Sequence, residues 1–269
     1  MQPIKVYADR RSQPSRAVII FCRYSGESDR FRGDHGGSVQ VSAPHRRIQN
    51  ICSAARGTLI ASFVSSEINP MGQVPAIVDG RFKLFESHAI LRYLASVFPG
   101  VADHWYPADL FTRAKIESIL DWHHSNLRRG AATLVMHTAL APFLGLATSP
   151  HVVKQAEKLL MQSLGRIESV WLKGDAKFLL GSPQPSIADL SLVCEIMQLE
   201  ILGDDERDRF LGAHEKILIW MDNVKKATSP HFEEAHELLF QVKASMLSNA
   251  AAANQTSEPS TKLKIVSKL

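Results

Sequence analysis

Residues 4–22 read IKVYADRRSQPSRAVIIFC, and this stretch decides the fold of the chain. Ile4 to Ala8 is a short run with apolar Ile4 and Val6, which predicts a strand. A polar loop follows, and Pro14 introduces an apolar run that ends at Cys22. Because proline is tolerated in the first turn of a helix, the stretch predicts strand, loop and helix in that order.

A second pair of strands is indicated further along the chain. The apolar runs Val74–Val78 and Phe82–Phe85 flank Asp79-Gly80. Asp-Gly between two apolar runs is the strongest short signal for a hairpin. Ser87 can then cap a helix over His88–Ala95. The first hundred residues therefore predict a small α/β domain.

The pattern becomes helical from about Ala108 onward, where apolar residues recur three and four positions apart. Ser186-Ile187-Ala188-Asp189 has the form of a capping box, with Asp in the place that Glu or Gln usually holds. Ala250–Thr261 is rich in Ala, Asn, Ser and Pro and predicts a disordered tether. We expect helices over Arg113–Arg129, Val152–Leu172, Ile187–Leu202, His214–Lys226 and Phe232–Met246.

Composition narrows the class of protein. The net charge of +4 is scattered, without a basic stripe interleaved with aromatics, so we expect no nucleic-acid partner. No apolar run reaches the roughly 18 residues that a membrane span needs, and the strand-like start predicts no signal or transit peptide. Cys22, Cys52 and Cys194 lack metal-site spacing and predict a reducing compartment.

Several motifs together resemble one family. They are VYADRRSQPSRA at residues 6–17, NP at 69–70, QVPA at 73–76, ESHAI at 86–90, DWHHSNLRR at 121–129 and SIADL at 186–190. In combination they are similar to glutathione transferases, and the Ser-Gln-Pro start and the Trp…Leu-Arg-Arg helix resemble the plant theta class. The resemblance covers residues 1–22 and about 67–247.

The resemblance implies a fold with two parts and a tail. Residues 1–97 would form a thioredoxin-like glutathione-binding domain, and residues 98–109 a linker. Residues 110–247 would form an all-helical domain, and residues 248–269 a flexible tail. The fold class is therefore α/β followed by all-α.

Ser12 is the catalytic residue that the resemblance implies. The thiolate of glutathione is the nucleophile, but the thiol is mostly protonated at neutral pH. A hydroxyl that donates a hydrogen bond to sulfur, at a helix N-terminus, favours the anion. The alternative interpretation is that Ser12 only caps the helix behind it. Sequence context alone does not separate the two, and the family pattern favours catalysis.

The resemblance also implies a glutathione site. The Val74-Pro75 bond would be cis, so that the backbone of Val74 faces the cysteinyl part of glutathione. Glu86-Ser87 opens a helix whose free N–H groups bind anions, and the γ-glutamyl carboxylate would lie there. Ser87 could equally be a plain helix cap. The predicted glutathione-binding residues are Arg11, Ser12, Gln73, Val74, Glu86, Ser87 and Arg128.

Two further candidates lie on the helix that begins near Arg113. Arg128 could reach the glutathione site, or it could be a surface arginine like Arg129 beside it. His123-His124 raises the question of a metal, but adjacent helical residues face about 100° apart and form a poor chelate. We expect no metal and no cofactor, with glutathione as a co-substrate.

Residues 23–66 depart from the family pattern. They are rich in Arg, Gly and Ser, where the family has an edge strand and a second helix that contacts glutathione. Ser38–Ser42 could replace the strand. We interpret the segment as aberrant, arising from a shifted reading frame or retained non-coding sequence. The family's contacts in the second helix cannot be assigned to any residue here.

The last three residues read as an address. Ser267-Lys268-Leu269 is a tripeptide that the peroxisomal import receptor recognises at a carboxyl terminus. The alternatives are an ordinary chain end and a cytoplasmic protein. We expect the peroxisome.

The resemblance implies an enzyme of detoxification. It would conjugate glutathione to hydrophobic electrophiles and reduce organic and lipid hydroperoxides, as a homodimer. The aberrant segment favours an alternative, a catalytically impaired binding or interaction protein with the same fold. An interaction domain of the kind found in translation factors has no support beyond the shared fold.

Overall fold

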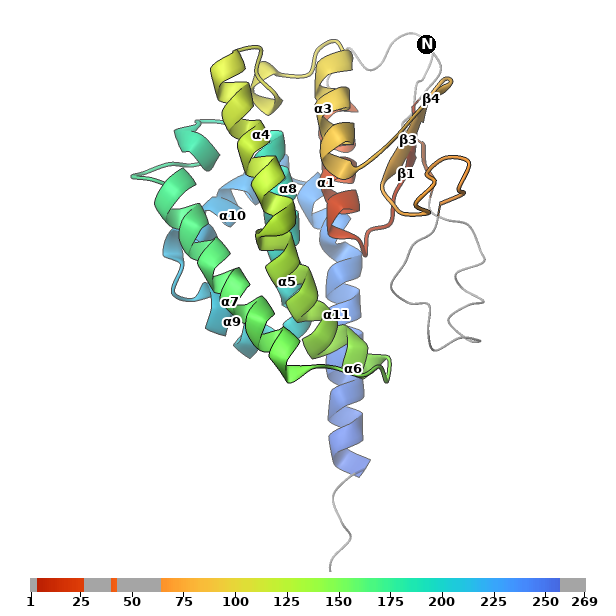
Figure 1. Ribbon diagram of the computed structural model, residues 1–269, viewed down its shortest axis with the longest axis vertical. Helices are drawn as coiled ribbons and strands as arrows, with labels where there is room; N and C mark the ends of the chain where they lie inside the picture. Colours follow the sequence, from red (N-terminus) through yellow and green to blue (C-terminus); the bar gives the residue numbers. More distant parts are fainter. Residues whose placement is uncertain (1–3, 27–39, 43–63, 257–269) are drawn as a thin grey trace, which may run out of the picture.

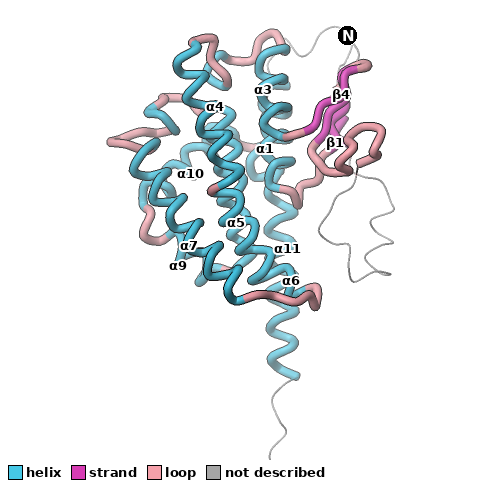
Figure 2. Tube along the Cα trace, viewed as in Figure 1, coloured by secondary structure: helices cyan, strands magenta, loops and turns pink. Residues whose placement is uncertain are grey.

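The computed structural model of the chain describes residues 4–26, 40–42 and 64–256. A small sheet with α1 and α3 comes first, and the helices that follow pack beside it (Figures 1 and 2). This arrangement confirms the predicted fold class, a thioredoxin-like part followed by a helical part. The boundaries given above for the domains stay predictions.

Within the described residues, four short strands make the sheet, in the order β2-β1-β3-β4. β1 and β2 are parallel, with Val6 opposite Val41, and the other two pairs are antiparallel. Gly80 adopts a φ of 58° in the turn between β3 and β4, so the predicted hairpin is confirmed. The strands are β1 Lys5–Tyr7, β2 Gln40–Ser42, β3 Ala76–Asp79 and β4 Phe82–Phe85.

The edge strand agrees with the sequence analysis, in which Ser38–Ser42 could replace the strand of the family. Gln40–Ser42 pairs with Lys5–Tyr7 along the whole of β1, and residues 38 and 39 lie outside the described residues. Backbone hydrogen bonds form the ladder and tolerate many side chains, so an unusual sequence can still supply the strand. The predicted loss of the second helix lies outside the described residues.

Helix α1 (Gln13–Gly26) lies between the sheet and the helical part. Ala17 to Phe21 are each at most 1% exposed, so the helix is buried on every side. It packs against α3 (Ser87–Val97), α8 (Ile187–Ile196) and α11 (His231–Thr256). Residues at the N-terminal end of α1 are therefore held by both parts of the molecule.

The predicted helix Arg113–Arg129 is divided into two in the structure. Asn126 leaves helical geometry with a φ of −119° and a ψ of −87°. Its side-chain nitrogen donates to the carbonyl of Trp122, a local bond that competes with the helical ladder. The first helices of this part are η1 Asp103–Trp105, α4 Leu110–Ser125, α5 Leu127–Val135, the π-helical turn η2 Met136–Leu140, and α6 Ala141–Phe143.

Two differences concern the C-terminal half. The acidic helix α9 (Asp204–Leu211) was not predicted, because it lacks the apolar periodicity that indicates a helix. The predicted tail begins at residue 248, but α11 continues to Thr256 because Ala250–Ala253 are strong helix formers. The remaining elements are α7 Pro150–Arg166, η3 Ile167–Trp171, η4 Leu179–Gly181, η5 Met197–Leu202, α9 Asp204–Leu211 and α10 Glu215–Thr228.

The predicted capping box is confirmed at the start of α8. Asp189 is fully buried, and its two oxygens accept bonds from Leu179 N, Trp220 Nε1 and the backbone and hydroxyl of Ser186. The two bonds from Ser186 cap α8 itself, and those from Leu179 and Trp220 join α8 to η4 and α10. Among residues 4–26, 40–42 and 64–256, no helix is long and apolar enough to cross a membrane.

Candidate active site

Two adjacent cavities lie where the sheet meets the helices. The larger has a volume of about 310 Å³ and is bounded by residues 11–13, α5, η2, η5 and α11. The smaller has about 130 Å³ and is bounded by residues 69–75, the start of α3 and the end of α4. Gln73, Val74 and Arg128 line both cavities, so the two are parts of one cleft.

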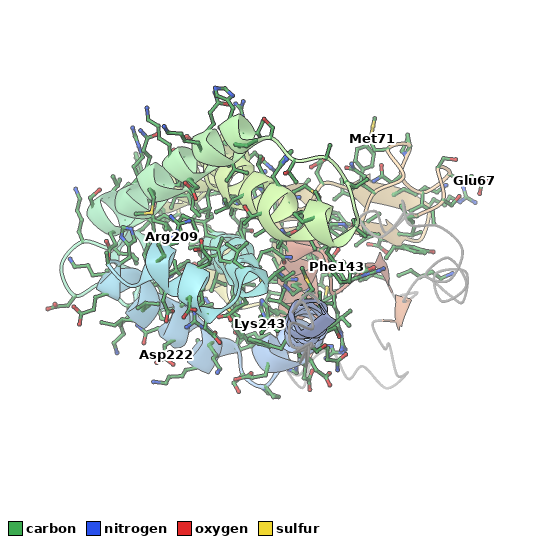
Figure 3. The ribbon with its side chains drawn as sticks, turned by 90° about the horizontal axis from the view of Figure 1, so that it is seen from below. Glu67, Met71, Phe143, Arg209, Asp222 and Lys243 are labelled. Atoms are coloured by element: carbon green, nitrogen blue, oxygen red, sulfur yellow. The ribbon has the colours of Figure 1, made fainter. Side chains whose placement is uncertain are left out.

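The larger cavity has a mainly apolar wall. Val135 and Leu140 come from α5 and η2, and Leu239 and Val242 from α11. Seen from below along α11, Phe143 of α6 lies beside that helix, while Met71 and Glu67 lie on the side of the sheet (Figure 3). A mainly apolar cavity with a few polar groups is the usual form of a small-molecule site.

Ser12 stands at the rim of the larger cavity, in the turn between β1 and α1. Its backbone N–H donates to the carbonyl of Asp9 (2.9 Å), and its carbonyl accepts the first helical bond, from Arg16 N (3.1 Å). The Ser12 hydroxyl makes no hydrogen bond with the part of the chain that the structure describes. It is therefore not engaged in capping α1 and is available to a ligand.

Arg11 lines the larger cavity, but its guanidinium contacts protein. Arg11 Nε lies 3.0 Å and 3.1 Å from the two oxygens of Asp9, and Nη2 lies 2.5 Å from one of them. The Arg11 backbone N–H also donates to Asp9. Asp9 thus fixes the backbone of the turn immediately before Ser12.

Arg16 is a residue that the sequence analysis did not single out. Its side chain is fully buried in α1. Nη1 donates to the carbonyls of Arg10 (2.9 Å) and Arg11 (3.3 Å), and Nη2 donates to Cys194 O (3.1 Å) and Gln198 Oε1 (2.7 Å). One guanidinium therefore ties the turn that carries Ser12 to α8 and η5.

The Val74-Pro75 bond is cis, as the family resemblance implies. Asn69 shapes the turn in front of it: Asn69 Nδ2 donates to the carbonyl of Gln73 (2.8 Å), and Asn69 Oδ1 accepts from Met71 N (3.0 Å). Asn69 is 3% exposed. This amide holds Gln73 and Val74 where both cavities reach them.

Glu86 and Ser87 line the smaller cavity at the start of α3. Glu86 has a φ of 70°, a backbone conformation that costs a non-glycine residue free energy and that occurs preferentially at functional sites. Ser87 begins the helix, and no side chain caps its first turn. The free N–H groups there favour an anion.

A row of polar side chains lies beside the smaller cavity, and three of its members, His123, His124 and Arg128, line that cavity. His88 Nε2 lies 3.1 Å from His123 Nδ1, and His123 Nε2 lies 3.4 Å from an oxygen of Glu195. Arg128 Nη1 donates to the same oxygen at 2.8 Å. His124 packs against His88 with the rings tilted by 43° and 4.4 Å between their centroids. The bond to Glu195 thus holds the Arg128 guanidinium in place, and Arg128 is not an isolated surface arginine.

Burial controls the protonation of this row. Burial and the neighbouring His123 lower the pKa of His88 to about 2. Burial alone would raise the pKa of Glu195, but the hydrogen bond with His123 and the charge of Arg128 bring it below its usual value. The row therefore holds a neutral His88 and an ionised Glu195 next to Arg128.

The structure brings all seven predicted glutathione-binding residues to the two cavities. Their roles stay predictions, because position alone does not show binding. No group of three or more His, Cys, Asp or Glu in the described ranges is placed to hold a metal ion. Sequence reasoning missed Gln13, Arg16, Asn69, His88, Glu195 and Gln198, although the first four stand inside the motifs that carry the resemblance.

Comparison with known proteins places this cleft in a family. A profile of the glutathione S-transferase N-terminal domain matches residues 61–96. The crystal structure of human glutathione transferase theta-2, in complex with glutathione and an unknown ligand, has a TM-score of 0.71 at 27% identity. That likeness covers 95% of this chain and 92% of the human one. Glutathione S-transferase T1 of Arabidopsis thaliana is 58% identical over 90% of this chain and 91% of its own length. The chain belongs to the plant theta-class glutathione transferases.

A second plant relative of the transferase is a longer protein. Glutathione S-transferase T2 of Arabidopsis thaliana is 50% identical over 98% of this chain. The matched region makes up 41% of the length of that relative. The theta-class match thus extends well beyond the residues that the domain profile covers.

Two buried histidines predict acid sensitivity of the transferase. Burial lowers the pKa of His88 to about 2 and that of His236 to about 3. In the unfolded chain both histidines titrate near pH 6.5, whereas in the folded state they stay neutral to much lower pH. The unfolded state therefore binds more protons below about pH 6.5, and the free energy of unfolding falls as the pH falls. Two such protons give a slope of about 2.7 kcal/mol per pH unit.

Urea unfolding at intervals between pH 6.0 and 4.5 measures this slope. We expect His88→Gln and His236→Gln each to remove about half of it, and the exposed His151→Gln to leave it unchanged. Equal slopes in all four proteins would show that the two histidines are protonated in the folded state.

Proposed function

We propose that this transferase activates the thiol of glutathione with the Ser12 hydroxyl, joins the sulfur to apolar electrophiles and reduces organic hydroperoxides. The observation that carries the proposal is the position of Ser12. Its unengaged hydroxyl stands before the first turn of α1, at the rim of the larger cavity. A hydroxyl donor and a helix N-terminus both stabilise a thiolate.

The smaller, polar cavity suits glutathione. The N–H groups at Glu86 and Ser87 would receive the γ-glutamyl carboxylate, and the backbone of Val74 would pair with the cysteinyl peptide. Arg128 lines both cavities, and its guanidinium donates a hydrogen bond to Glu195. The thiol would then point from the smaller cavity toward Ser12.

The larger, apolar cavity suits the second substrate. With an electrophilic carbon, the thiolate forms a C–S bond and the leaving group departs with the electron pair. With a hydroperoxide, the thiolate attacks the outer oxygen and the O–O bond breaks. The alkoxide takes a proton and leaves as the alcohol, and sulfur is oxidised to the sulfenic acid. A second glutathione reduces this to the disulfide and water.

Replacing Ser12 by Ala tests the central assignment. We expect the pKa of bound glutathione, measured from thiolate absorbance, to rise by about one to two units, which is about 1.4 to 2.7 kcal/mol of lost thiolate stabilisation. The value of kcat/KM with cumene hydroperoxide should fall by a similar factor of about ten to a hundred. Ser15→Ala, one turn into α1, is the matched control. If the thiol pKa does not move in Ser12→Ala, Ser12 is only part of the turn.

One observation favours a second candidate function. The domain profile begins at residue 61, so the chain up to residue 60 lies outside the matched range. A transferase fold with an incomplete glutathione site would bind apolar ligands without catalysis. Retention on immobilised glutathione, followed by the hydroperoxide assay, separates the two: an impaired binding protein would show neither retention nor turnover.

We also propose a homodimer. β4 is an edge strand of the sheet, and Phe82 on it is 45% exposed. Leu110 and Phe111, at the start of α4, are 72% and 82% exposed. An edge strand and large exposed apolar side chains are features that proteins cover. In this proposal a second copy covers them.

Sedimentation equilibrium tests the dimer directly. We expect twice the 29.8 kDa mass of one chain, and a shift toward one chain in the double variant Phe82→Glu and Phe111→Glu. A mass of 29.8 kDa for the unmodified protein would contradict the proposal.

Peroxisomal import is our proposal for the location. It rests on Ser267-Lys268-Leu269 as a carboxyl-terminal tripeptide, and α11, which precedes it, extends past the other helices (Figure 1). A fluorescent protein fused to the N-terminus should collect in peroxisomes, and deletion of Leu269 should release it into the cytoplasm. A cytoplasmic signal from the intact fusion would refute the address.

A further inference from the structure

Gln198 is a polar side chain in the wall of the larger cavity. It lies in η5, directly after α8, and is 4% exposed. Its neighbours along the same wall include the apolar Ile201 and Leu239. Ser12 lines the same cavity. The family motifs do not include Gln198, so its role has to be read from its contacts.

Arg16 fixes the orientation of the Gln198 amide. A guanidinium has only donors, so the atom that faces it must be the amide oxygen. Arg16 Nη2 lies 2.7 Å from Gln198 Oε1, within the range of a strong charge-assisted bond. The flipped amide would set N–H against N–H at that distance. The NH₂ group is therefore the end that remains for the cavity.

The Nε2 atom of Gln198 carries two N–H donors, and no acceptor in the described part of the chain pairs with them. Within residues 4–26, 40–42 and 64–256, the oxygen of this amide is engaged and the nitrogen is not. A donor without a partner in an apolar wall costs about 1–3 kcal/mol when no water or ligand satisfies it. A substrate oxygen in the cavity would supply the acceptor.

We propose that Gln198 donates a hydrogen bond from Nε2 to an oxygen of the electrophile, and that the transferase favours electrophiles that carry such an oxygen. The preferred class is α,β-unsaturated carbonyl compounds. Alkyl and benzyl halides without oxygen lack the contact. The inference rests on the proposed function in one respect: the larger cavity takes the electrophile.

The contact would act on the transition state of conjugate addition. The thiolate sulfur forms a bond to the β-carbon, and the electron pair of the C=C bond moves toward the carbonyl. The oxygen becomes an enolate with negative charge, to which an N–H donates more strongly than to the neutral ketone. The enolate then takes a proton from water at the α-carbon. A donor that strengthens along the reaction lowers the barrier.

Gln198→Glu separates this role from a merely structural one. The carboxylate keeps an oxygen for Arg16 but loses the NH₂ donor. Gln198→Met removes both groups. Gln162→Glu is the matched control, because Gln162 is exposed on α7 away from both cavities and the variant adds the same charge. The electrophiles are 4-phenyl-3-buten-2-one, which has the carbonyl, and benzyl chloride, which has no oxygen.

The measured quantity is the ratio of kcat/KM for the enone to kcat/KM for benzyl chloride. Any change in the glutathione thiol affects both substrates and cancels in the ratio. We expect the ratio to fall about tenfold in Gln198→Glu and Gln198→Met and to stay within twofold in Gln162→Glu. The unfolding temperature of Gln198→Glu should remain that of the unmodified protein, since Arg16 keeps its partner.

An unchanged ratio in Gln198→Glu would overturn the inference and leave the amide as a partner of Arg16 alone. Failure of the proposed function has a different signature, because the unmodified protein would then turn over neither substrate. In that case calorimetry with the two glutathione conjugates decides. The unmodified protein should bind the ketone conjugate more tightly than S-benzylglutathione, and Gln198→Glu should lose that preference. Equal affinities in both proteins would equally reject the role of Gln198.

Discussion

The buried guanidinium of Arg16 is the interaction on which the rest of the active site depends. It contacts the carbonyls of Arg10 and Arg11 on one side and Cys194 and Gln198 on the other. Burial lowers its pKa, an effect that nearby groups, including Glu195, oppose. The hydrogen bonds from Nη1 and Nη2 offset the cost of burying this charge, so the turn before Ser12 and the end of α8 must keep their relative positions. The turn that carries Ser12 is thereby held by the helical part as well as by its own strand and helix.

Helix α8 is the second half of the same arrangement. All ten of its residues are buried, yet it carries the carboxylates Asp189 and Glu195. Asp189 joins α8 to the elements around its N-terminal end. Glu195, near the other end, holds Arg128 and faces His123. The helix thus carries Asp189, which joins structural elements, and Glu195, which orients Arg128 in the cleft. Its hydrophobic packing and its ion pairs belong to one rigid element.

Much of the fold could be read from local patterns, because strands, hairpins and amphipathic helices depend on neighbouring residues. The Asp79-Gly80 turn, the box at Ser186 and the position of Ser12 all follow from short motifs. Glu195 and Gln198 stand outside these motifs, and the role of Arg16 could not be found from the motif at residues 6–17 that contains it. Arg16 and its partner Cys194 are 178 positions apart, and nothing in their spacing shows that they meet. The break at Asn126 and the extension of α11 were missed for a different reason, since one side-chain bond and four alanines outweigh periodicity.

The last helix has a consequence for how the protein is made. Leu239 and Val242 of α11 form part of the wall of the larger cavity, while Ser12 at its rim is synthesised well before them. The partners of Arg16 on α8 and η5 leave the ribosome late as well. During translation the N-terminal part therefore carries a cation that has the carbonyls of Arg10 and Arg11 but not yet its acceptors on α8 and η5, and the cleft closes only when α11 has emerged. A nascent chain that stalls before α11 would hold every predicted glutathione-binding residue and still lack one wall of the cavity.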